Sequence, residues 1–167
     1  MKVYSRQVEG PHNYAVGHTG ILVHNSSGNV RPRVAVRQSP TDANRLFFAF
    51  DAAAPGGRGG ASVRVDPGQR LASIDGVHKN VGVPPRSTGG LLAEGLRQTG
   101  MPKPGVLEGF NVERTTASAL AAGGNGQGTL IGNMLEDAAR ALGGTVARWE
   151  PIKDGNIWHL RVHISYP

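Results

Sequence analysis

The sequence predicts an α+β fold: an antiparallel sheet with two or more helices packed on one face and a C-terminal β-hairpin, preceded by a short β segment. Residues 145–167 indicate the hairpin, because polar and apolar residues alternate on both sides of Asp154-Gly155. Residues 88–98 and 129–142 indicate the helices. Ser87 or Thr88 can cap the first helix, an apolar stripe runs along the second, and glycines follow both.

Length and composition describe one modest domain with a small segment in front of it. Of the 167 residues, 38% are hydrophobic, 5% are aromatic and 25 are glycines, so loops occupy much of the fold. Cysteine is absent, which excludes disulfides, thiolate nucleophiles and thiolate-bound zinc. The apolar runs are short, and we expect neither a membrane span nor a signal peptide. The net charge of +6 favours a polyanionic partner such as nucleic acid, or an acidic protein.

The N-terminal residues form a separate β unit in this prediction. Three short runs predict strands, with a turn before the last of them: 3–8, 14–16 and 21–23, with the turn at 17–20. The last run ends in His24-Asn25, and a Ser/Gly/Pro-rich stretch follows. An asparagine side chain can attack its own backbone carbonyl and break the bond after it, while a histidine protonates the departing amine. The Asn25-Ser26 bond is therefore a candidate scission point, with an ordinary strand end as the alternative.

The stretch VEGPHNYAVGHTGILVHN resembles the C-terminal end of a HINT (hedgehog/intein) module, whose chain ends in a His-Asn pair. The resemblance implies that residues 1–25 are the remnant of an autoprocessing module in which His24 and Asn25 carry self-cleavage. Proteins in which such a module directly precedes a variable C-terminal domain resemble bacterial polymorphic toxins. By this resemblance, residues 26–167 are the toxin effector domain.

Several short elements precede the hairpin in the predicted effector domain. We expect strands at residues 33–37 and 62–65, and either a strand or the end of a helix at residues 46–50. Glycine and turn-forming residues predict loops at residues 54–60 and 75–80.

The alternating hairpin predicts two chemically different faces. With Asp154 and Gly155 as the loop residues, Glu150 lies opposite His159, Arg148 opposite Arg161 and Val146 opposite His163. One face is then apolar, with Trp158, Leu160, Val162 and Ile164. The other face carries six polar side chains, namely Arg148, Glu150, His159, Arg161, His163 and Ser165.

The residue types on this polar face are those that cleavage of RNA without a metal requires. A base takes a proton from a 2′-hydroxyl, an acid protonates the leaving 5′-oxygen, and a cation stabilises the charged transition state. We interpret Glu150 as the base, His159 or His163 as the acid, and Arg148 and Arg161 as a phosphate clamp. The arrangement resembles barnase-like ribonucleases in architecture and residue type. The alternatives are a solvated sheet face, or a metal site at the two histidines, although the face lacks further Asp or Cys ligands.

Four further residues are candidate substrate contacts. His78 and Lys79 lie in an expected loop, where a plain turn is the alternative to a phosphate contact. Arg86 precedes a helix N-terminus, which is a natural anion site, and Ser165 extends the polar face. Glu113, in the stretch NVERTT, is expected to cap a helix or lie on the surface.

The sequence therefore predicts a polymorphic-toxin effector that is a metal-independent ribonuclease, with RNA as substrate and no cofactor. Two alternatives are an NAD-consuming toxin, either an ADP-ribosyltransferase or an NAD glycohydrolase, and a non-catalytic nucleic-acid-binding domain. The toxin resemblance also implies a cognate immunity protein, acidic to match the basic effector, and secretion into the cytoplasm of target bacteria. We expect the domain to be a monomer.

Overall fold

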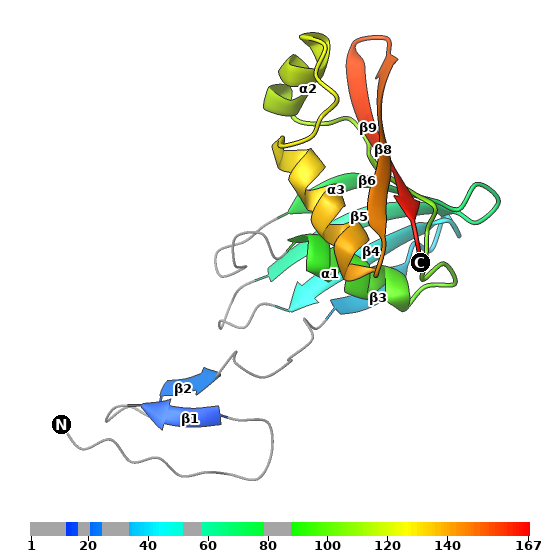
Figure 1. Ribbon diagram of the computed structural model, residues 1–167. Coiled ribbons are helices and arrows are strands. Elements are labelled where there is room, and N and C mark those ends of the chain that lie inside the picture. The colour runs from blue at the N-terminus through cyan, green and yellow to red at the C-terminus, as the bar shows by residue number, and fades with distance from the viewer. Residues whose placement is uncertain (1–12, 17–20, 25–33, 52–57, 79–87) are drawn as a thin grey trace. The chain divides into compact units, whose positions relative to one another are not determined.

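The computed structural model describes residues 13–16, 21–24, 34–51, 58–78 and 88–167. The chain divides into two units, residues 1–31 and residues 32–167. In its described part, the second unit is a mixed α+β fold with a seven-stranded, mostly antiparallel open sheet and three helices (Figure 1). The predicted α+β class is confirmed. No helix in these described ranges is long and apolar enough to cross a membrane.

The first unit contains a small two-stranded sheet. Strand β1 (Asn13–Val16) pairs antiparallel with β2 (Ile21–His24), and these strands cover two of the three predicted N-terminal runs. The third predicted run, residues 3–8, lies outside the described residues. Asn25 and Ser26 also lie outside them, so self-cleavage and the boundary after residue 25 stay predictions.

The large sheet is built from seven strands in the spatial order β3-β4-β5-β6-β7-β9-β8. Strands β6 and β7 are parallel, and the other neighbouring pairs are antiparallel. A parallel pair needs a crossover connection, and the helix α1 (Thr88–Arg97) lies between these two strands in the chain. The strand bounds are β3 Val34–Gln38, β4 Arg45–Asp51, β5 Arg58–Asp66, β6 Leu71–His78, β7 Val106–Gly109, β8 Thr145–Asp154 and β9 Ile157–Ser165.

Two segments that the sequence assigned to loops belong partly to strands. Residues 58–60 begin β5, and residues 75–78 end β6. The glycine at position 60 lets the two backbones approach, since a Cβ there would lie 2.7 Å from the carbonyl oxygen of Phe48 on β4. Pairing with neighbouring strands therefore overrides the turn-like composition of these segments. The ambiguous segment 46–50 is a strand, within β4.

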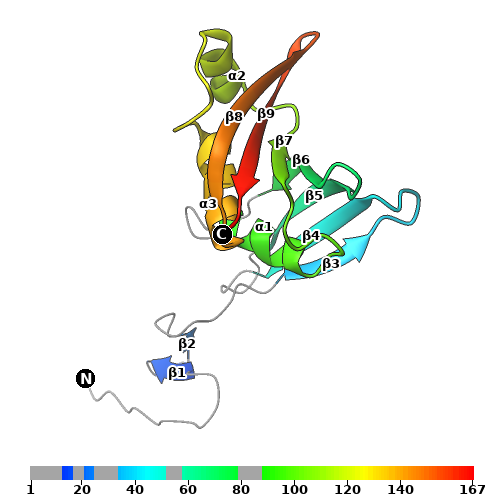
Figure 2. The same ribbon diagram turned by 45° about the vertical axis from the view of Figure 1, so that its right-hand side comes forward.

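Side-chain oxygens begin the other two helices, α2 (Arg114–Ala121) and α3 (Leu130–Ala141). Thr129 accepts a hydrogen bond from the backbone nitrogen of Gly132 at 3.1 Å. Glu113 accepts one from the backbone nitrogen of Thr116 at 3.0 Å, which confirms its expected capping role. Helix α1 contacts β3 and β4, α3 contacts β7, β8 and β9, and the two helices contact each other (Figure 2).

The core lies between these helices and one face of the sheet. Its fully buried side chains from both layers include Phe48, Val63, Leu107, Leu160 and Val162 of the sheet and Leu92, Leu96 and Leu135 of the helices. The two layers approach closely at Gly95 of α1, where an added Cβ would overlap the ring of Phe48. Because Gly95 has no side chain, α1 packs directly on the ring of Phe48.

The predicted register of β8 and β9 is wrong. Asp154 pairs with Ile157, so the two loop residues are Gly155 and Asn156, and Glu150 lies opposite Arg161 instead of His159. The turn starts one residue later than predicted because Gly155 takes the first loop position, with a φ of 56° that glycine adopts without steric cost. This shift moves each partner by two residues, so the polar and apolar faces are kept.

A second irregularity lies near the start of β8. Arg148 pairs with His163 and Val146 pairs with Ile164, so Ala147 is the extra residue of a β-bulge. The predicted pairs of Arg148 with Arg161 and of Val146 with His163 are therefore also wrong. The bulge turns Val146 toward the apolar face and leaves Arg148 beside His163.

Two glycines of one helix give a test of this packing. Gly95→Ala should destabilise the protein by about 1–3 kcal/mol, because the core must move to admit the methyl group. Gly90→Ala meets nothing within 4 Å and should stabilise α1 by up to about 1 kcal/mol. Urea unfolding of the two variants measures both effects, and equal effects would contradict the tight contact at Phe48.

Candidate functional site

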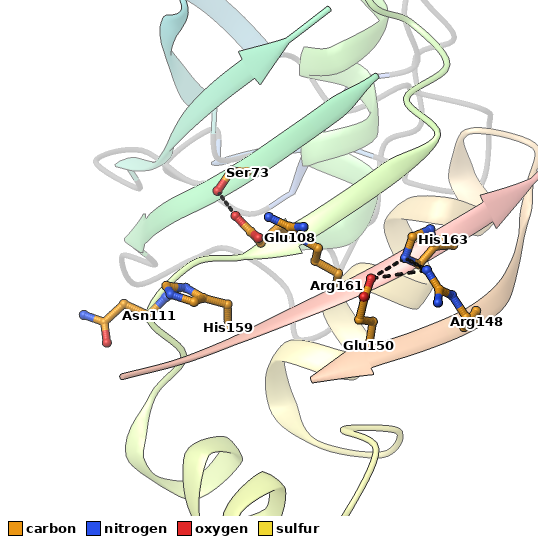
Figure 3. A network of polar contacts seen from close by, with 8 residues as sticks. All are labelled: Ser73, Glu108, Asn111, Arg148, Glu150, His159, Arg161 and His163. Atoms are coloured by element: carbon orange, nitrogen blue, oxygen red, sulfur yellow. Dashed lines mark hydrogen bonds and ion pairs between the residues drawn. The ribbon is translucent and has the colours of Figure 1, made fainter. Parts of the chain in front are cut away.

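The sheet face opposite the helices carries a continuous row of polar side chains. Strand pairing places the members of this row directly opposite one another, and opposed residues share a face. We call it the polar row, and its members in spatial order are Arg45, Arg64, Ser73, Glu108, Arg161 and Glu150. The part of the row from Ser73 onward, with its neighbours, is shown in Figure 3.

A buried carboxylate lies in the middle of the polar row. Glu108 is 5% exposed, and its two oxygens have different partners. Ser73 donates its hydroxyl to Oε1 at 2.7 Å, and Arg161 donates Nε–H to Oε2 at 2.5 Å. A buried charge is costly without such partners, so this network fixes β7 between β6 and β9. The bond from Nε also orients the Arg161 guanidinium. The two terminal nitrogens of Arg161 make no hydrogen bond to the described part of the chain.

The next cluster joins β8 and β9. Glu150 Oε2 lies 2.6 Å from Nε2 of His163 and 3.4 Å from Nη2 of Arg148. The same Nε2 lies 2.7 Å from Nη2 of Arg148. Arginine only donates, and one ring nitrogen cannot donate and accept at the same time. Nε2 of His163 therefore either carries a hydrogen and donates it to Glu150, or lacks a hydrogen and accepts one from Arg148.

The electrostatics of this cluster keep Glu150 ionised. The hydrogen bond from His163 lowers the pKa of Glu150, partial burial opposes this effect, and the charge of Arg148 adds to the lowering. The net pKa lies below the ordinary value of 4.5. Glu150 is thus a carboxylate that can accept a proton at neutral pH.

The structure separates His159 from the other predicted catalytic groups. His159 is 5% exposed and lies opposite Ile152. Its Nδ1 accepts a hydrogen bond from the backbone nitrogen of Asn111 at 3.0 Å, and its ring packs on Phe110 with centroids 4.3 Å apart. Asn111 has a φ of 50°, in the left-handed region. His159 therefore holds the loop after β7 in place.

The two remaining predicted contacts that the structure describes, Ser165 and His78, are not paired with Glu150. Ser165 is exposed at the end of β9, opposite Thr145. His78 is the last residue of β6, not part of a loop. Lys79 and Arg86 lie outside the described residues. Of the predicted site, the structure brings together Arg148, Glu150 and His163, with Arg161 in the neighbouring position.

Sequence reasoning missed Glu108 and Ser73. Strand β7 has four residues, too few for an alternating pattern to identify, and its partners are distant in sequence. One signal was available, since Glu108 stands between Leu107 and Gly109 in a short run bounded by Pro104-Gly105. A lone carboxylate in such a run indicates a buried charge that needs a partner.

A pocket of about 510 Å³ is lined by the ends of β6 and β7 and by residues of α1 and α3. Phe110 and Asn111 line one side of it, and Ile131 and Met134 of α3 line another. The lining is mainly apolar, and Glu113 borders it through the start of α2. Of the residues in the Glu108 network none lines the pocket, and the loop that His159 holds at Asn111 is the part of the site that borders it.

In the described part of the chain, no three His, Asp or Glu side chains gather as metal ligands. Comparisons of the chain with protein-family models, with curated proteins and with solved structures found no match. The interpretation of the site therefore depends on its own geometry.

Removal of Arg161 tests the buried network. Arg161→Ala leaves the Glu108 carboxylate without its cation and should lower the free energy of unfolding by about 1–3 kcal/mol. The matched variant Arg148→Ala removes an arginine whose side chain is 62% exposed, and it should change stability by less than about 0.5 kcal/mol. Chemical unfolding near neutral pH makes the comparison, and equal losses would show that Glu108 does not depend on Arg161.

A second ion pair on this face gives a pH-dependent test. Burial raises the pKa of Asp75, but hydrogen bonds from Ser62 and Arg45 outweigh it, so the pKa lies below its ordinary 3.8. A carboxylate with a lowered pKa stabilises the fold above pH 3.8, and this stability is lost as the pH falls through its folded pKa.

Asp75→Asn should therefore destabilise the protein near pH 7, and its difference from wild type should shrink below pH 3.8. Unfolding curves across this range provide the measurement, with the exposed Asp154→Asn as control. A difference that stays constant with pH would mean that the charge of Asp75 does not stabilise the fold.

Proposed function

We propose that residues 26–167 are the effector domain of a bacterial polymorphic toxin and that this domain cleaves RNA without a metal. The observation that carries the proposal is the Glu150–His163 pair, with Nε2 and Oε2 2.6 Å apart and Arg148 at the same ring nitrogen. An acceptor, a donor and cations on one open sheet face are the groups that RNA transesterification uses.

Glu150 is the general base in this proposal. Its lowered pKa keeps it ionised, so it can take the proton from a ribose 2′-hydroxyl as that oxygen attacks phosphorus. His163, in its protonated form, gives its proton to the 5′-oxygen as the P–O bond breaks. The products are a 2′,3′-cyclic phosphate and a free 5′-hydroxyl. The direct contact of the two groups then lets Glu150 return its proton to His163, which restores the starting state.

The two arginines stabilise the extra negative charge on the phosphate oxygens. Glu108 orients Arg161 by accepting its Nε–H, so the guanidinium is fixed before RNA arrives. Arg148, whose side chain is 62% exposed, can turn from His163 toward phosphate. This movement also frees Nε2 of His163 to carry its proton.

The toxin assignment is supported by the HINT-like N-terminal residues and by the net charge of +6. In this proposal the effector is secreted and acts in the cytoplasm of target bacteria. An acidic immunity protein that covers the basic sheet face would protect the producing cell, because it would block phosphate from the arginines.

Incubation of the full chain with total RNA tests the function. Wild type should release products that end in a cyclic phosphate or a 3′-phosphate, and cleavage should continue in EDTA. Glu150→Gln and His163→Ala should each lower the rate by about 10²- to 10⁴-fold. Thr145→Ala, at an exposed position of β8, is the control and should cleave like wild type. The acidic limb of the rate profile should lie below pH 4.5, where Glu150 becomes protonated.

Three results would overturn the ribonuclease proposal. Full activity of Glu150→Gln with His163→Ala would place the chemistry elsewhere, and loss of activity in EDTA would require a metal. Consumption of NAD without RNA cleavage would support an NAD-consuming toxin. Salt-sensitive RNA binding without any product would support a non-catalytic domain.

A further inference from the structure

The polar row continues beyond the proposed catalytic cluster. From Ser73 it passes to Arg64 on β5 and then to Arg45 on β4, each directly opposite the next. These strands lie on the far side of β6 from the Glu150–His163 pair. The proposed chemistry uses none of these arginines, so they need a separate explanation.

An exposed aromatic ring lies among these arginines. Phe47 of β4 is 44% exposed and pairs with Arg37 on one side and Ser62 on the other. It shares a face with Arg45, two residues earlier on the same strand. Arg64 lies diagonally across from it on β5, within reach of a long side chain. The Phe47 side chain therefore neighbours three arginines, Arg37, Arg45 and Arg64, on the face of the sheet away from the core.

Of the three arginines on this surface, Arg45 forms an ion pair with Asp75, whereas Arg37 and Arg64 are only weakly neutralised by the described residues. Arg64 has a side chain that is 55% exposed, and its nearest carboxylate, Asp42, is 4.0 Å away. An exposed pair at this distance contributes little. Arg37 is exposed as well, and Arg45 is held by Asp75. The surface thus offers positive charge and a π face together.

We infer that this outer face of β3, β4 and β5 binds single-stranded RNA, with a base stacked on Phe47 and phosphates at Arg37 and Arg64. The inference rests on the proposed function for its purpose, since the bound strand would be the part of the substrate that flanks the cleaved bond. Aromatic rings beside basic side chains bind single strands in this way, because every base has a π face.

The spacing suits one continuous strand. Arg64 and Arg161 are separated along the polar row by three interstrand steps of about 4.8 Å each. A strand clamped at Arg161 therefore reaches Arg64 and Phe47 within a few nucleotides. A duplex is too stiff and hides its base faces, so the surface should prefer single strands.

Fluorescence anisotropy with the full chain tests the inference. The probe is a short, labelled 2′-O-methyl single strand, which has no 2′-hydroxyl and cannot be cleaved by transesterification. Phe47→Ala should weaken binding by roughly five- to hundredfold, the range for loss of one stacked base. Arg37→Ala and Arg64→Ala should each reduce the slope of log K against log salt by about 0.7. Phe47→Ala should leave that slope unchanged.

Arg140→Ala is the matched charge control, because this α3 side chain is 70% exposed and lies on the helical layer. It should bind the probe as wild type does. Cleavage of a dinucleotide, which is too short to reach β5, should be unaffected by Phe47→Ala or Arg64→Ala. These readouts separate binding on the sheet face from the chemistry at Glu150.

Probe affinity within twofold of wild type in the Phe47 and Arg64 variants would overturn the inference. A protein partner would then be the better explanation of the exposed Phe47 and its arginines. An equal loss of probe affinity in Arg140→Ala would also overturn the inference, because it would show that the probe is attracted by the overall positive charge and not by this face. If wild type cleaves no RNA but the variants lose probe binding as described, the proposed function fails while the RNA surface stands.

Discussion

The Glu108 carboxylate is the constraint on which the arrangement of the site depends. Its burial in the sheet demands partners, and these come from Ser73 on one neighbouring strand and Arg161 on the other. The same bonds therefore fix the order of β6, β7 and β9 and aim one guanidinium. Glu150, the base of the proposed reaction, lies opposite Arg161. Its position therefore depends on Glu108, which holds Arg161 but takes no part in the proposed reaction.

In our proposal, one face of the sheet stabilises the fold and the other carries the chemistry. The inner face packs large side chains such as Phe48 and Leu160 under the helices, with glycine at position 95 allowing direct contact. The outer face carries arginines, carboxylates and an exposed phenylalanine. A sheet that is rigid on one side can hold charged groups close together on the other, since the backbone cannot relax to separate them. That rigidity is what a preorganised site for phosphate requires.

The sequence predicted the fold class, the helices α1 and α3, a capping or surface role for Glu113 and the two faces of β9, because these depend on local patterns. It misplaced the register of β8 and β9, since Asp154-Gly155-Asn156 permits two turns and the glycine takes the first loop position, with a φ of 56°. It also missed Glu108 and the parallel pairing of β6 with β7, which join segments that are distant in the chain. The sequence placed Glu150 and His163 on the same polar face, but it paired Glu150 with His159 and so did not predict the direct contact with His163.

The central claim is that a carboxylate and a histidine on this face activate a ribose hydroxyl. The most direct measurement uses an all-deoxy oligonucleotide that contains a single ribonucleotide. Attack by a 2′-oxygen predicts one cut, on the 3′ side of the ribonucleotide, with a cyclic phosphate at the new end and no cut in the all-deoxy strand. Cleavage of the all-deoxy strand, or cuts away from the ribonucleotide, would contradict the account.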